Sequence, residues 1–389
     1  MKCLYVNTHF APDYEFGGVV ESASKIHKYI QRLMPFFVVC VSKNSAAVNS
    51  YLCGCGICFP SIFFHRIGFS VALISPLWKL IREHDLIAVN GIFTFPVTLA
   101  QLFAVLQKKP FIVSVRGGLE PWRLQQKKYR KAIFNKLIAF PLLRKASCIH
   151  VTSDDEYSNL LNLGFTKLKL ISNGIDNELI ESFTPKKNCF FPEGKFVFLF
   201  LSRTDKEKGL DILLRAYARF VKANPVQEYV LAIVGPDHQG YLAQMNIEYE
   251  KNNIYRLEGV YGEKKFQIIH ESSCVILPSY SENFGNIVAE GMGMAKPVIT
   301  TTGTPWHVLK EKKLGFYVEP TVEEIFFAMQ SIYHLSDSER DSMGQESRRY
   351  IFENMSWAGK AIRFTDLFAS ILNTQHGAEL IERQPNGKF

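Results

Sequence analysis

The sequence lacks the features that mark membrane-spanning or secreted proteins. No stretch reaches the roughly 18 to 20 consecutive apolar residues that span a bilayer, and the N-terminal residues MKCLYVNTHF contain no apolar signal core. We therefore expect a protein that is soluble or peripheral on a membrane. Eight cysteines in a chain without a secretory signal further predict a reduced, cytoplasmic protein.

Motifs for metals and nucleic acids are also missing. Cys53, Cys55 and Cys58 would offer thiolates to a metal, but zinc takes four ligands and no second cluster of matching spacing follows. The acids of residues 154–156, DDE, do not form a D-x-D pair, and their place at a helix start predicts a capping role. No zinc finger or RRM-like motif occurs, which argues against nucleic acid as a partner. We expect no metal and no cofactor.

The length of the chain predicts two domains, and the distribution of charge predicts that they differ in net charge. With 389 residues, 47% of them hydrophobic, the chain can bury two cores, because single cores tend to split beyond roughly 250 to 300 residues. Residues 1–187 hold 23 Lys and Arg against 12 Asp and Glu, whereas residues 188–389 hold 22 against 25. The basic surplus belongs to the first half.

Short runs rich in Val, Ile and Phe alternate with longer helical stretches. In the first half these runs are Cys3–Val6, Phe36–Val41, Leu86–Val89, Phe111–Val115, Cys148–Val151 and Leu168–Ile171. The second half repeats the scheme with Phe196–Leu201, Val230–Val234, Ile254–Leu257, Cys274–Leu277, Val298–Thr301 and Phe316–Val318. This alternation indicates parallel sheets covered on both faces, hence an α/β fold of two doubly wound, Rossmann-like domains.

The domain boundaries follow from where the pattern stops. We predict an N-terminal domain over residues 1–172, a polar, Pro-containing linker over 173–192 and a C-terminal domain over 193–356. The last helical stretch, 357–372, is expected to pack back on the N-terminal domain, and a polar tail, 373–389, follows it. Ligands of doubly wound sheets bind outside the carboxyl ends of the strands, so the cleft between the domains is the expected site.

Two acids frame the segment Ser281–Glu290, SENFGNIVAE, which follows a predicted strand. Gly285 or Asn286 opens a helix, whose unpaired N–H groups and dipole suit a phosphate, and Gly285 lets the anion approach closely. Glu290, about one turn into the helix, is placed to accept hydrogen bonds from ribose hydroxyls, and Glu282 to face the hydroxyls of a sugar. The alternative is that both acids are solvated.

The spacing E-x7-E, with FGN between the acids and an AEG continuation, resembles the signature of the retaining glycosyltransferases of family four, also called group 1. The resemblance implies a GT-B fold, in which two Rossmann-like domains face each other across a cleft. It also implies transfer from a nucleoside diphosphate sugar without an essential metal. It makes Glu282 catalytic, and it assigns donor binding to Glu290, Asn283, Phe284, Gly285, Asn286 and Ile287.

Other family features fall where the resemblance requires them. Arg203 and Lys208 follow the strand Phe196–Leu201 and resemble the family's Arg-x4-Lys-Gly clamp, in which a planar fork and a point charge hold the leaving diphosphate. The resemblance makes both residues catalytic; the alternative is two solvated cations. Residues 172–176, SNGID, look like the family's domain-linking segment, with a geometric role.

In the first half, Gly17 and Gly18 form a loop that in the family lies under the acceptor and the donor phosphate. They do not fit G-x-G-x-x-G, which counts against a dinucleotide-binding oxidoreductase. Where many relatives carry a His after the fourth strand, this chain has Arg116, which we take as a cation facing the cleft. An ion pair with Glu120 is the alternative.

Two segments resemble a polysaccharide-assembling branch of the family. These are RGGLEPW, which begins at Arg116, and TGTPW, which ends at Trp306. Trp306 is either a core residue or a platform for a base or sugar. The branch implies a saccharide or lipid-linked saccharide as acceptor, in the synthesis of lipopolysaccharide O-antigen, capsule or exopolysaccharide.

The stretch from Arg116 to Lys145 contains nine Lys or Arg residues against one acid, Glu120, with apolar side chains interspersed. A basic amphipathic helix of this kind can lie on anionic lipid, which would place the enzyme on the inner face of the cytoplasmic membrane. An ordinary helix with a solvated basic face is the alternative.

Two other functions remain open from the sequence alone. A nucleotide-sugar epimerase shares the twin-domain scaffold, and a non-catalytic nucleotide-sugar-binding protein would keep the same residues. The segment Gly293–Lys296, GMAK, departs from the family pattern, in which a CG pair is common. The base, the sugar, the acceptor, the linkage and the oligomeric state are not specified by the sequence.

Overall fold

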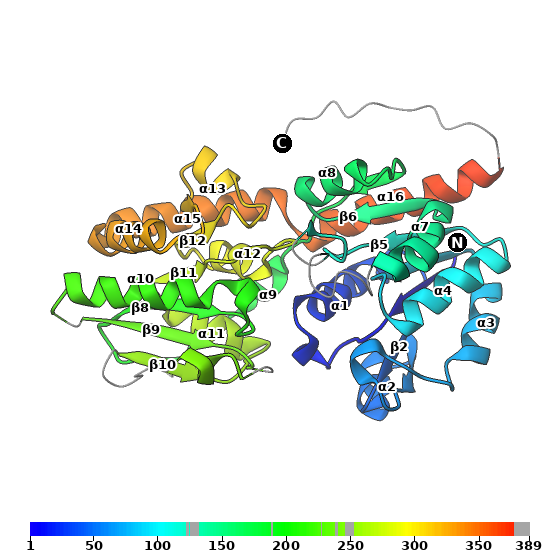
Figure 1. Ribbon diagram of the computed structural model, residues 1–389, viewed down its shortest axis with the longest axis horizontal. Helices are drawn as coiled ribbons and strands as arrows, with labels where there is room; N and C mark the ends of the chain where they lie inside the picture. The colour runs from blue at the N-terminus through cyan, green and yellow to red at the C-terminus, as the bar shows by residue number, and fades with distance from the viewer. Residues whose placement is uncertain are drawn as a thin grey trace.

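The computed structural model contains two domains that lie side by side, each built around one parallel sheet (Figure 1). It describes residues 1–121, 124, 132–187, 190–226, 228–237, 240–245 and 253–376. Part of the predicted membrane segment lies outside the described residues: Arg123, Lys127, Lys128, Arg130 and Lys131. The predicted tail beyond residue 376 lies outside them as well.

The first sheet has seven parallel strands in the order β3-β2-β1-β4-β5-β6-β7. The strands are β1 (Cys3–Asn7), β2 (Phe36–Ser42), β3 (Gly56–Pro60), β4 (Leu86–Asn90), β5 (Phe111–Ser114), β6 (Cys148–Val151) and β7 (Leu168–Leu170). The order reverses between β1 and β4, and such a reversal opens a crevice at the carboxyl ends of the strands.

Helices cover both faces of the first sheet. They are α1 (Gly18–Ile30), α2 (Ser45–Leu52), α3 (Ile74–Glu83), α4 (Phe95–Leu106), α7 (Phe140–Lys145) and α8 (Asp154–Asn162). The short turns η1 (Tyr14–Phe16), η2 (His65–Ile67) and η3 (Asn135–Ala139) precede α1, α3 and α7. Side chains of α1 and α2 pack on one face and those of α3, α4 and α8 on the other.

The second sheet has six parallel strands in the order β10-β9-β8-β11-β12-β13. They are β8 (Phe196–Leu201), β9 (Tyr229–Val234), β10 (Ile254–Leu257), β11 (Cys274–Leu277), β12 (Val298–Thr301) and β13 (Phe316–Val318). The order reverses between β8 and β11, so a second crevice opens there. The loops after these two strands carry the clamp cations and the E-x7-E segment.

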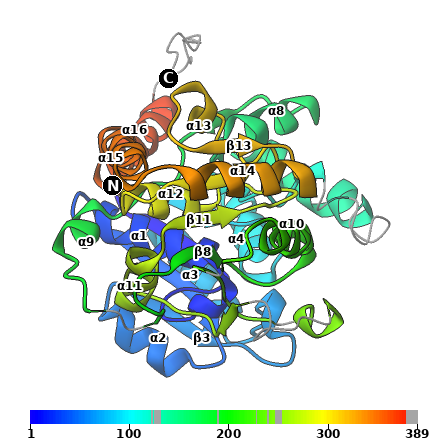
Figure 2. The same cartoon turned by 90° about the vertical axis from the view of Figure 1, so that its left-hand side faces the viewer.

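The helices of the second domain are α10 (Leu210–Ala223), α11 (Glu263–Glu271), α12 (Asn286–Gly293), α13 (Val308–Glu311), α14 (Val322–His334) and α15 (Asp337–Asn354). Two short turns, η4 (Lys206–Lys208) and η5 (Leu242–Met245), complete this domain. Helices α10 and α14 lie side by side on one face of the sheet, and α12 and α15 pack together on the other (Figure 2). A bilayer-crossing helix does not occur in the part of the chain that the structure describes.

The strands agree with the sequence prediction to within one residue, with one omission, β3. In the segment CGCGIC, which begins at Cys53, the sequence offers three thiolates to a metal, and it gives no sign of a strand because glycine is unfavourable in strands. In the structure Cys58 belongs to β3 and pairs in register with Cys40 of β2, while Cys53 and Cys55 are exposed. The apolar run here is too short and too rich in glycine to indicate a strand.

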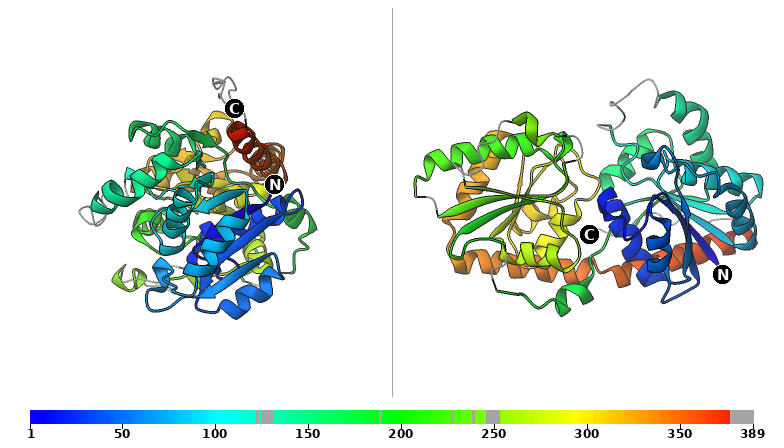
Figure 3. Two further views of the ribbon diagram at one scale, coloured as in Figure 1. Left: turned by 90° about the vertical axis from the view of Figure 1, so that its right-hand side faces the viewer. Right: turned by 90° about the horizontal axis from the view of Figure 1, so that it is seen from below.

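The chain crosses between the domains at two places that lie next to each other. The short helix α9 (Asn177–Ser182) follows the first crossing, and α16 (Trp357–His376) follows the second. Ile175 N–H donates to the Met355 carbonyl over 2.7 Å, and Trp357 N–H donates to the Ile175 carbonyl over 3.0 Å. Helices α15 and α16 run one after the other along one side of both domains, and α16 packs on α1 (Figure 3).

Asp176 fixes the first crossing to the first domain. Its carboxylate accepts hydrogen bonds from Lys25 Nζ at 2.8 Å and from the Tyr29 hydroxyl at 2.7 Å, and it caps α9 by accepting from Leu179 N–H. Burial opposes ionisation, but the hydrogen bonds from Lys25 and its neighbours outweigh it and lower the pKa of Asp176 to about 2. The ionised carboxylate is therefore stabilised by folding.

We expect Asp176→Asn to lower the free energy of unfolding at neutral pH by roughly 1 to 2 kcal/mol, allowing for solvent screening at the exposed edge of the network. Because the folded pKa is depressed from 3.8 to about 2, the difference from the wild type should persist above pH 4 and shrink as the pH falls towards 2. Urea unfolding across this range measures it. Asp366→Asn, an exposed change on α16, is the control, and a difference that did not vary with pH would contradict the assignment.

Candidate active site

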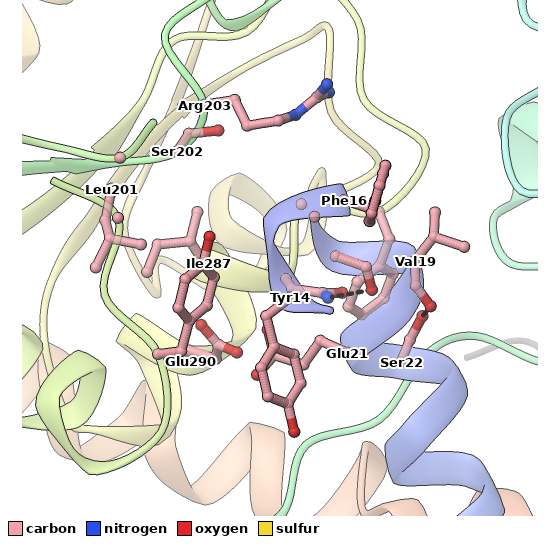
Figure 4. Close-up of a pocket in the computed structure, with 18 of the residues that line it drawn as sticks. Tyr14, Phe16, Val19, Glu21, Ser22, Leu201, Ser202, Arg203, Ile287 and Glu290 are labelled. Carbon is pink, nitrogen blue, oxygen red and sulfur yellow. Dashed lines mark hydrogen bonds between the residues drawn. The ribbon is translucent and has the colours of Figure 1, made fainter. Parts of the chain in front are cut away.

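A cavity of about 320 Å³ lies between the two domains. Every residue that the sequence assigned to the site lines it: Gly17, Gly18, Arg116, Arg203, Lys208, Glu282, Asn283, Phe284, Gly285, Asn286, Ile287 and Glu290. The first three come from the first domain and the others from the second. Figure 4 shows Leu201, Ser202 and Arg203 on one side of the cavity and the start of α1 on the other.

The E-x7-E segment forms a turn that leads directly into α12. Gly285 is the N-cap of the helix and has φ +76°, a left-handed conformation that favours glycine. Trp306 supports the turn from below: it is 1% exposed, its ring packs on Phe284, and its Nε1–H donates to the Phe284 carbonyl. Trp306 is therefore a core residue rather than a platform for a ligand.

Lys208 and Glu282 form an ion pair on the floor of the cavity. Lys208 Nζ lies 2.6 Å from Glu282 Oε1, and their side chains are 6% and 15% exposed. Lys208 ends η4, and Gly209 follows at φ +67°, packed so closely on the Pro278 carbonyl that a side chain would not fit. Gly209 therefore lets the loop after β8 pack against the loop after β11. This packing places Lys208 next to Glu282.

Arg203 extends from the loop after β8 towards the first domain. Its side chain is 38% exposed and lies 3.6 Å from Asp205. A Cβ added to Gly17 would lie 3.7 Å from Arg203 Nε, and one added to Gly18 would lie 2.9 Å from Asn286 Nδ2. The two glycines therefore let α1 begin close to the second domain and leave Arg203 open to the cavity.

Arg116 reaches the cavity from the loop after β5. The residue is 7% exposed and has φ +56°, and its Nε and Nη1 donate to Asn90 Oδ1 and Asn173 Oδ1, both at 2.7 Å. Glu120 instead accepts from Asn159, so an ion pair with Glu120 is not what holds Arg116 within the described residues. Two amide oxygens thus hold the buried guanidinium in place.

Glu290 shares a buried lysine with the first domain. Lys265 Nζ of α11 lies 2.6 Å from Glu290 Oε1 and 2.5 Å from Glu21 Oε1 of α1. Burial opposes the charge of Lys265, but the two carboxylates outweigh it and raise its pKa. One cation cannot neutralise two acids. Burial, with the added charge of Glu21, raises the pKa of Glu290 to about 7 against the pull of Lys265.

A second buried acid, Glu156 of α8, organises the loop that carries Arg116. Its carboxylate accepts from Gly117 N–H at 2.5 Å and from Thr152 N–H at 2.8 Å, and the side-chain amide of Asn283, turned so that its nitrogen faces the carboxylate, donates to it over 3.1 Å. Burial raises the pKa of Glu156, while these N–H groups oppose the shift. Ser153 is the N-cap of α8, so capping is not the role of the Glu156 carboxylate.

Sequence reasoning missed four residues of the site: Glu21, Glu156, Asn173 and Lys265. Asn173 Nδ2 donates to Asn286 Oδ1 over 3.1 Å, so an amide pair also joins the domains here. Residues 172–176 were recognised as a linking segment, but the part that Asn173 plays at the cavity was not. For Glu21 and Lys265 the sequence offers no local signal, because their contact joins two different domains.

A second cavity, of about 360 Å³, adjoins the first on the side of the first domain. The two cavities share Tyr14, Glu15, Phe16 and Tyr261. The second is lined further by polar side chains from the segments that follow β1, β2 and β3: His9, Asp13, Ser42, Lys43, Asn44 and His65. Burial lowers the pKa of His9 to about 4, so its ring is neutral at neutral pH.

Two family models match successive parts of the chain. The model for Glycosyltransferase Family 4 matches residues 16–179, and the model for glycosyl transferases group 1 matches residues 183–350. The first match contains Gly17, Gly18 and Arg116. The second contains both clamp cations and both acids of the E-x7-E segment.

Curated relatives are distant and are matched in part. An uncharacterised 41.2 kDa protein in the cps region of Klebsiella pneumoniae is 25% identical over 254 residues, 62% of this chain and 68% of that one. The alpha-1,3/1,6-mannosyltransferase of Mus musculus is 26% identical over 180 residues, 42% of this chain and 43% of the other. The D-inositol 3-phosphate glycosyltransferase of Thermobifida fusca is 27% identical over 173 residues, 41% and 40% of the two chains. The chain thus spans less than half of the last two relatives.

Solved structures share the architecture over nearly the whole chain. Anabaena HepE, solved in complex with UDP and glucose, has a TM-score of 0.72 at 17% identity and covers 95% of this chain and 100% of its own. A glycosyltransferase from Rickettsia africae has a TM-score of 0.71 at 17% identity, with 95% and 99% covered. A putative UDP-N-acetylglucosamine 2-epimerase from Listeria monocytogenes has a TM-score of 0.62 at 15% identity, with 96% of both chains covered. At these identities the likeness shows the fold alone.

The two facing Rossmann-like sheets are the GT-B fold, but the epimerase shows that this fold does not by itself distinguish transfer from epimerisation. The family models make that distinction, because both describe glycosyltransferases and together they extend from residue 16 to residue 350. The chain belongs to the group 1, family 4 glycosyltransferases.

Proposed function

We propose that this glycosyltransferase moves a sugar from a nucleoside diphosphate sugar to a saccharide or lipid-linked saccharide, with retention of the anomeric configuration. The observation that carries the proposal is the convergence of Arg116, Arg203 and Lys208 with Glu282 and Glu290 on one cavity between the domains. The UDP and glucose bound to Anabaena HepE support a nucleotide-sugar donor here. An epimerase of the same fold is the weaker candidate.

The cations are suited to hold the diphosphate of the donor. Arg203 offers a planar fork of N–H donors, Lys208 a point charge, and the start of α12 the partial positive charge of a helix N-terminus. Together they stabilise the charge that develops as the diphosphate leaves, which is the role a metal ion plays in other transferases. Arg116 adds a third cation in the cleft, which faces the phosphates, the transferring sugar or the acceptor.

The acids are suited to hold the two sugars of the donor. Glu290 lies one turn into α12, where its carboxylate accepts hydrogen bonds from the ribose hydroxyls. Glu282 precedes the helix and orients the transferring sugar, and its ion pair with Lys208 at 2.6 Å fixes the carboxylate before the donor arrives. Pre-organisation of this kind lowers the cost of reaching the transition state.

In the proposed reaction the acceptor hydroxyl attacks the anomeric carbon on the face from which the diphosphate departs. The bond from that carbon to the phosphate oxygen breaks, the bond to the acceptor oxygen forms, and a phosphate oxygen takes the hydroxyl proton. No side chain is required as a base. The protein supplies charge and alignment, which this kind of transfer most requires.

We assign the acceptor to the second cavity. It opens into the donor cavity past Tyr14 and Phe16, and its polar lining suits the hydroxyl groups of a saccharide. Gly17 and Gly18 lie at the junction, where missing side chains leave room for the acceptor hydroxyl to approach the donor.

We propose a cytoplasmic role in making lipopolysaccharide O-antigen, capsule or exopolysaccharide, which the cps location of the Klebsiella relative and the TGTPW segment support. Peripheral contact of residues 116–145 with anionic lipid belongs to this proposal. In the described part of that stretch Lys136, Arg144 and Lys145 are exposed, whereas Arg116 is buried and turned to the cavity. Arg116 therefore takes no part in the basic face.

A thermal-shift panel of nucleotides and nucleotide sugars tests the donor assignment. A bound ligand raises the midpoint because it stabilises the folded state by RT ln(1 + [L]/Kd), so we expect one base to give the largest shift. Arg203→Ala and Lys208→Met should reduce that shift, whereas the exposed Lys206→Met, in the same turn, should preserve it. A flat panel, or an altered sugar released without any acceptor, would count against a transferase acting on this class of donor.

Replacing Glu282 by Gln should lower the transfer rate by on the order of 10² while leaving nucleotide affinity almost unchanged, because the lost contacts strengthen in the transition state. Arg203→Ala or Lys208→Ala should cost a similar factor in rate. Sugar transfer and nucleotide affinity are measured on the same preparations. Glu258→Gln, at a side chain that is 90% exposed, is the control, and full activity of Glu282→Gln would refute the assignment.

The affinity for the donor should depend on pH through Glu290. With a pKa of about 7 in the free protein, Glu290 gains a proton as the pH falls through neutrality and loses its capacity to accept both ribose hydroxyls. We therefore expect binding of the nucleotide sugar, whose diphosphate diester does not titrate in this range, to weaken below pH 7. Calorimetry on the wild type and Glu290→Gln measures this: the variant should bind weakly with no pH dependence, and a parallel trend in both would exclude Glu290 as the source.

A further inference from the structure

A segment of the first domain presents large apolar side chains to solvent. Between β3 and the end of α3, Phe63 is 84% exposed, Phe64 67%, Ile67 46%, Val71 57% and Trp78 41%. Leu106 of α4 is 60% exposed. We call these six residues the apolar surface. Single exposed apolar residues are ordinary, but a group of this size marks an interaction site.

The apolar surface is held on a rigid base. Phe69 packs on Phe95 at the start of α4, with ring centroids 4.9 Å apart, and Trp78 packs edge-on against Phe103 of α4 at 5.0 Å. Helices α3 and α4 lie side by side, at the end of the first domain remote from the second (Figure 1). Phe63 itself has φ +56°, a conformation that a bulky side chain adopts at a cost, so the surrounding structure fixes the exposed turn.

Cations predominate among the charges around the apolar surface. Residues 22–82 contain no Asp or Glu, and between residues 22 and 119 the acids are Glu83 and Asp85. Arg66 is exposed within the apolar surface, and Arg82 and Lys108 are exposed next to Trp78 and Leu106, whereas Lys79 pairs with Glu83 of the same helix over 3.9 Å. Apolar side chains with cations beside them are complementary to an anionic lipid bilayer, in which the rings enter the acyl boundary and the cations meet head groups.

The same segment forms part of the second cavity. His65, between Phe64 and Arg66, lines that cavity, and its Nδ1 lies 2.8 Å from the Ser61 hydroxyl. A Cβ added to Gly68 would lie 2.8 Å from Thr8 and from Val41, so the turn packs on the carboxyl ends of β1 and β2. The exposed rings and the second cavity are therefore two sides of one short turn.

We propose that the apolar surface docks the enzyme on an anionic membrane and that Phe63 and Phe64 enter the bilayer, so that the second cavity opens at the lipid head groups. This surface is separate in sequence from residues 116–145. The choice of acceptor, a saccharide carried on a membrane lipid, rests on the proposed function; the docking itself does not. A lipid-linked acceptor then reaches the donor cavity without leaving the membrane.

Flotation with vesicles of phosphatidylcholine, with and without phosphatidylglycerol, tests the docking on the full chain. The wild type should float with the anionic vesicles. Phe63→Ser combined with Phe64→Ser should weaken partitioning by at least ~100-fold, since two aromatic side chains no longer leave water. Phe327→Ser combined with Val226→Ser, at side chains of the second domain that are 54% and 68% exposed, is the matched control and should float like the wild type.

Nucleotide binding by the same preparations separates this proposal from the proposed function. The Phe63 and Phe64 variant should keep the thermal shift given by the donor, because its two changes lie at exposed side chains. Flotation of that variant like the wild type, or no flotation of the wild type, overturns the docking proposal even where nucleotide still binds. A wild type that dimerises in sedimentation, with the variant monomeric and neither floating, also overturns it, because the surface would then bind a second copy.

Discussion

The buried Lys265 joins the two domains at the point where the cavity between them is formed. Its side chain is 5% exposed and contacts Glu21 of α1 and Glu290 of α12 at once. Removing an ammonium group from water costs several kcal/mol, which only close carboxylates offset. Because those carboxylates belong to different domains, the lysine is fully compensated only when the domains are together. The contact ties α1, and with it the glycine loop at its start, to the second domain.

Cationic and anionic side chains lie on different sides of the cavity, so a ligand with two different ends would bind in one orientation. Figure 4 shows Arg203 on one side and Glu21 and Glu290 on the opposite side. Arg116 carries its charge among amide oxygens and Lys208 is matched by a single acid, whereas Glu21 and Glu290 share one lysine. The side with Glu21 and Glu290 therefore carries excess negative charge, and the side with Arg203 presents a cation to the cavity. A ligand with an anionic group at one end and hydroxyl groups at the other fits this order.

The sequence predicts most readily the parts of the site that lie within one strand, turn and helix. The segment that contains Glu282 and Glu290, and the Lys208-Gly209 pair, are of this kind. Contacts between the domains are different: Glu21 and Lys265 are 244 residues apart, and no local pattern indicates that they meet. Glu156 resembles an ordinary first-turn acid until the loop of Arg116 folds over it. Trp306 and β3 could not be assigned from the sequence for a different reason. The burial of Trp306, and the pairing of β3 at the edge of its sheet, depend on neighbouring residues that the sequence does not identify.

The two crossings between the domains are paired through Ile175, Met355 and Trp357, and Gly174 has no room for a side chain beside them. Two bodies joined at two adjacent points can turn about the axis that runs through those points more easily than about any other axis. Such a turn would separate α1 from α12 and would break the contact of Lys265 with Glu21, while its contact with Glu290, in the same domain, would remain. A donor that meets both domains would therefore act directly on the angle between them.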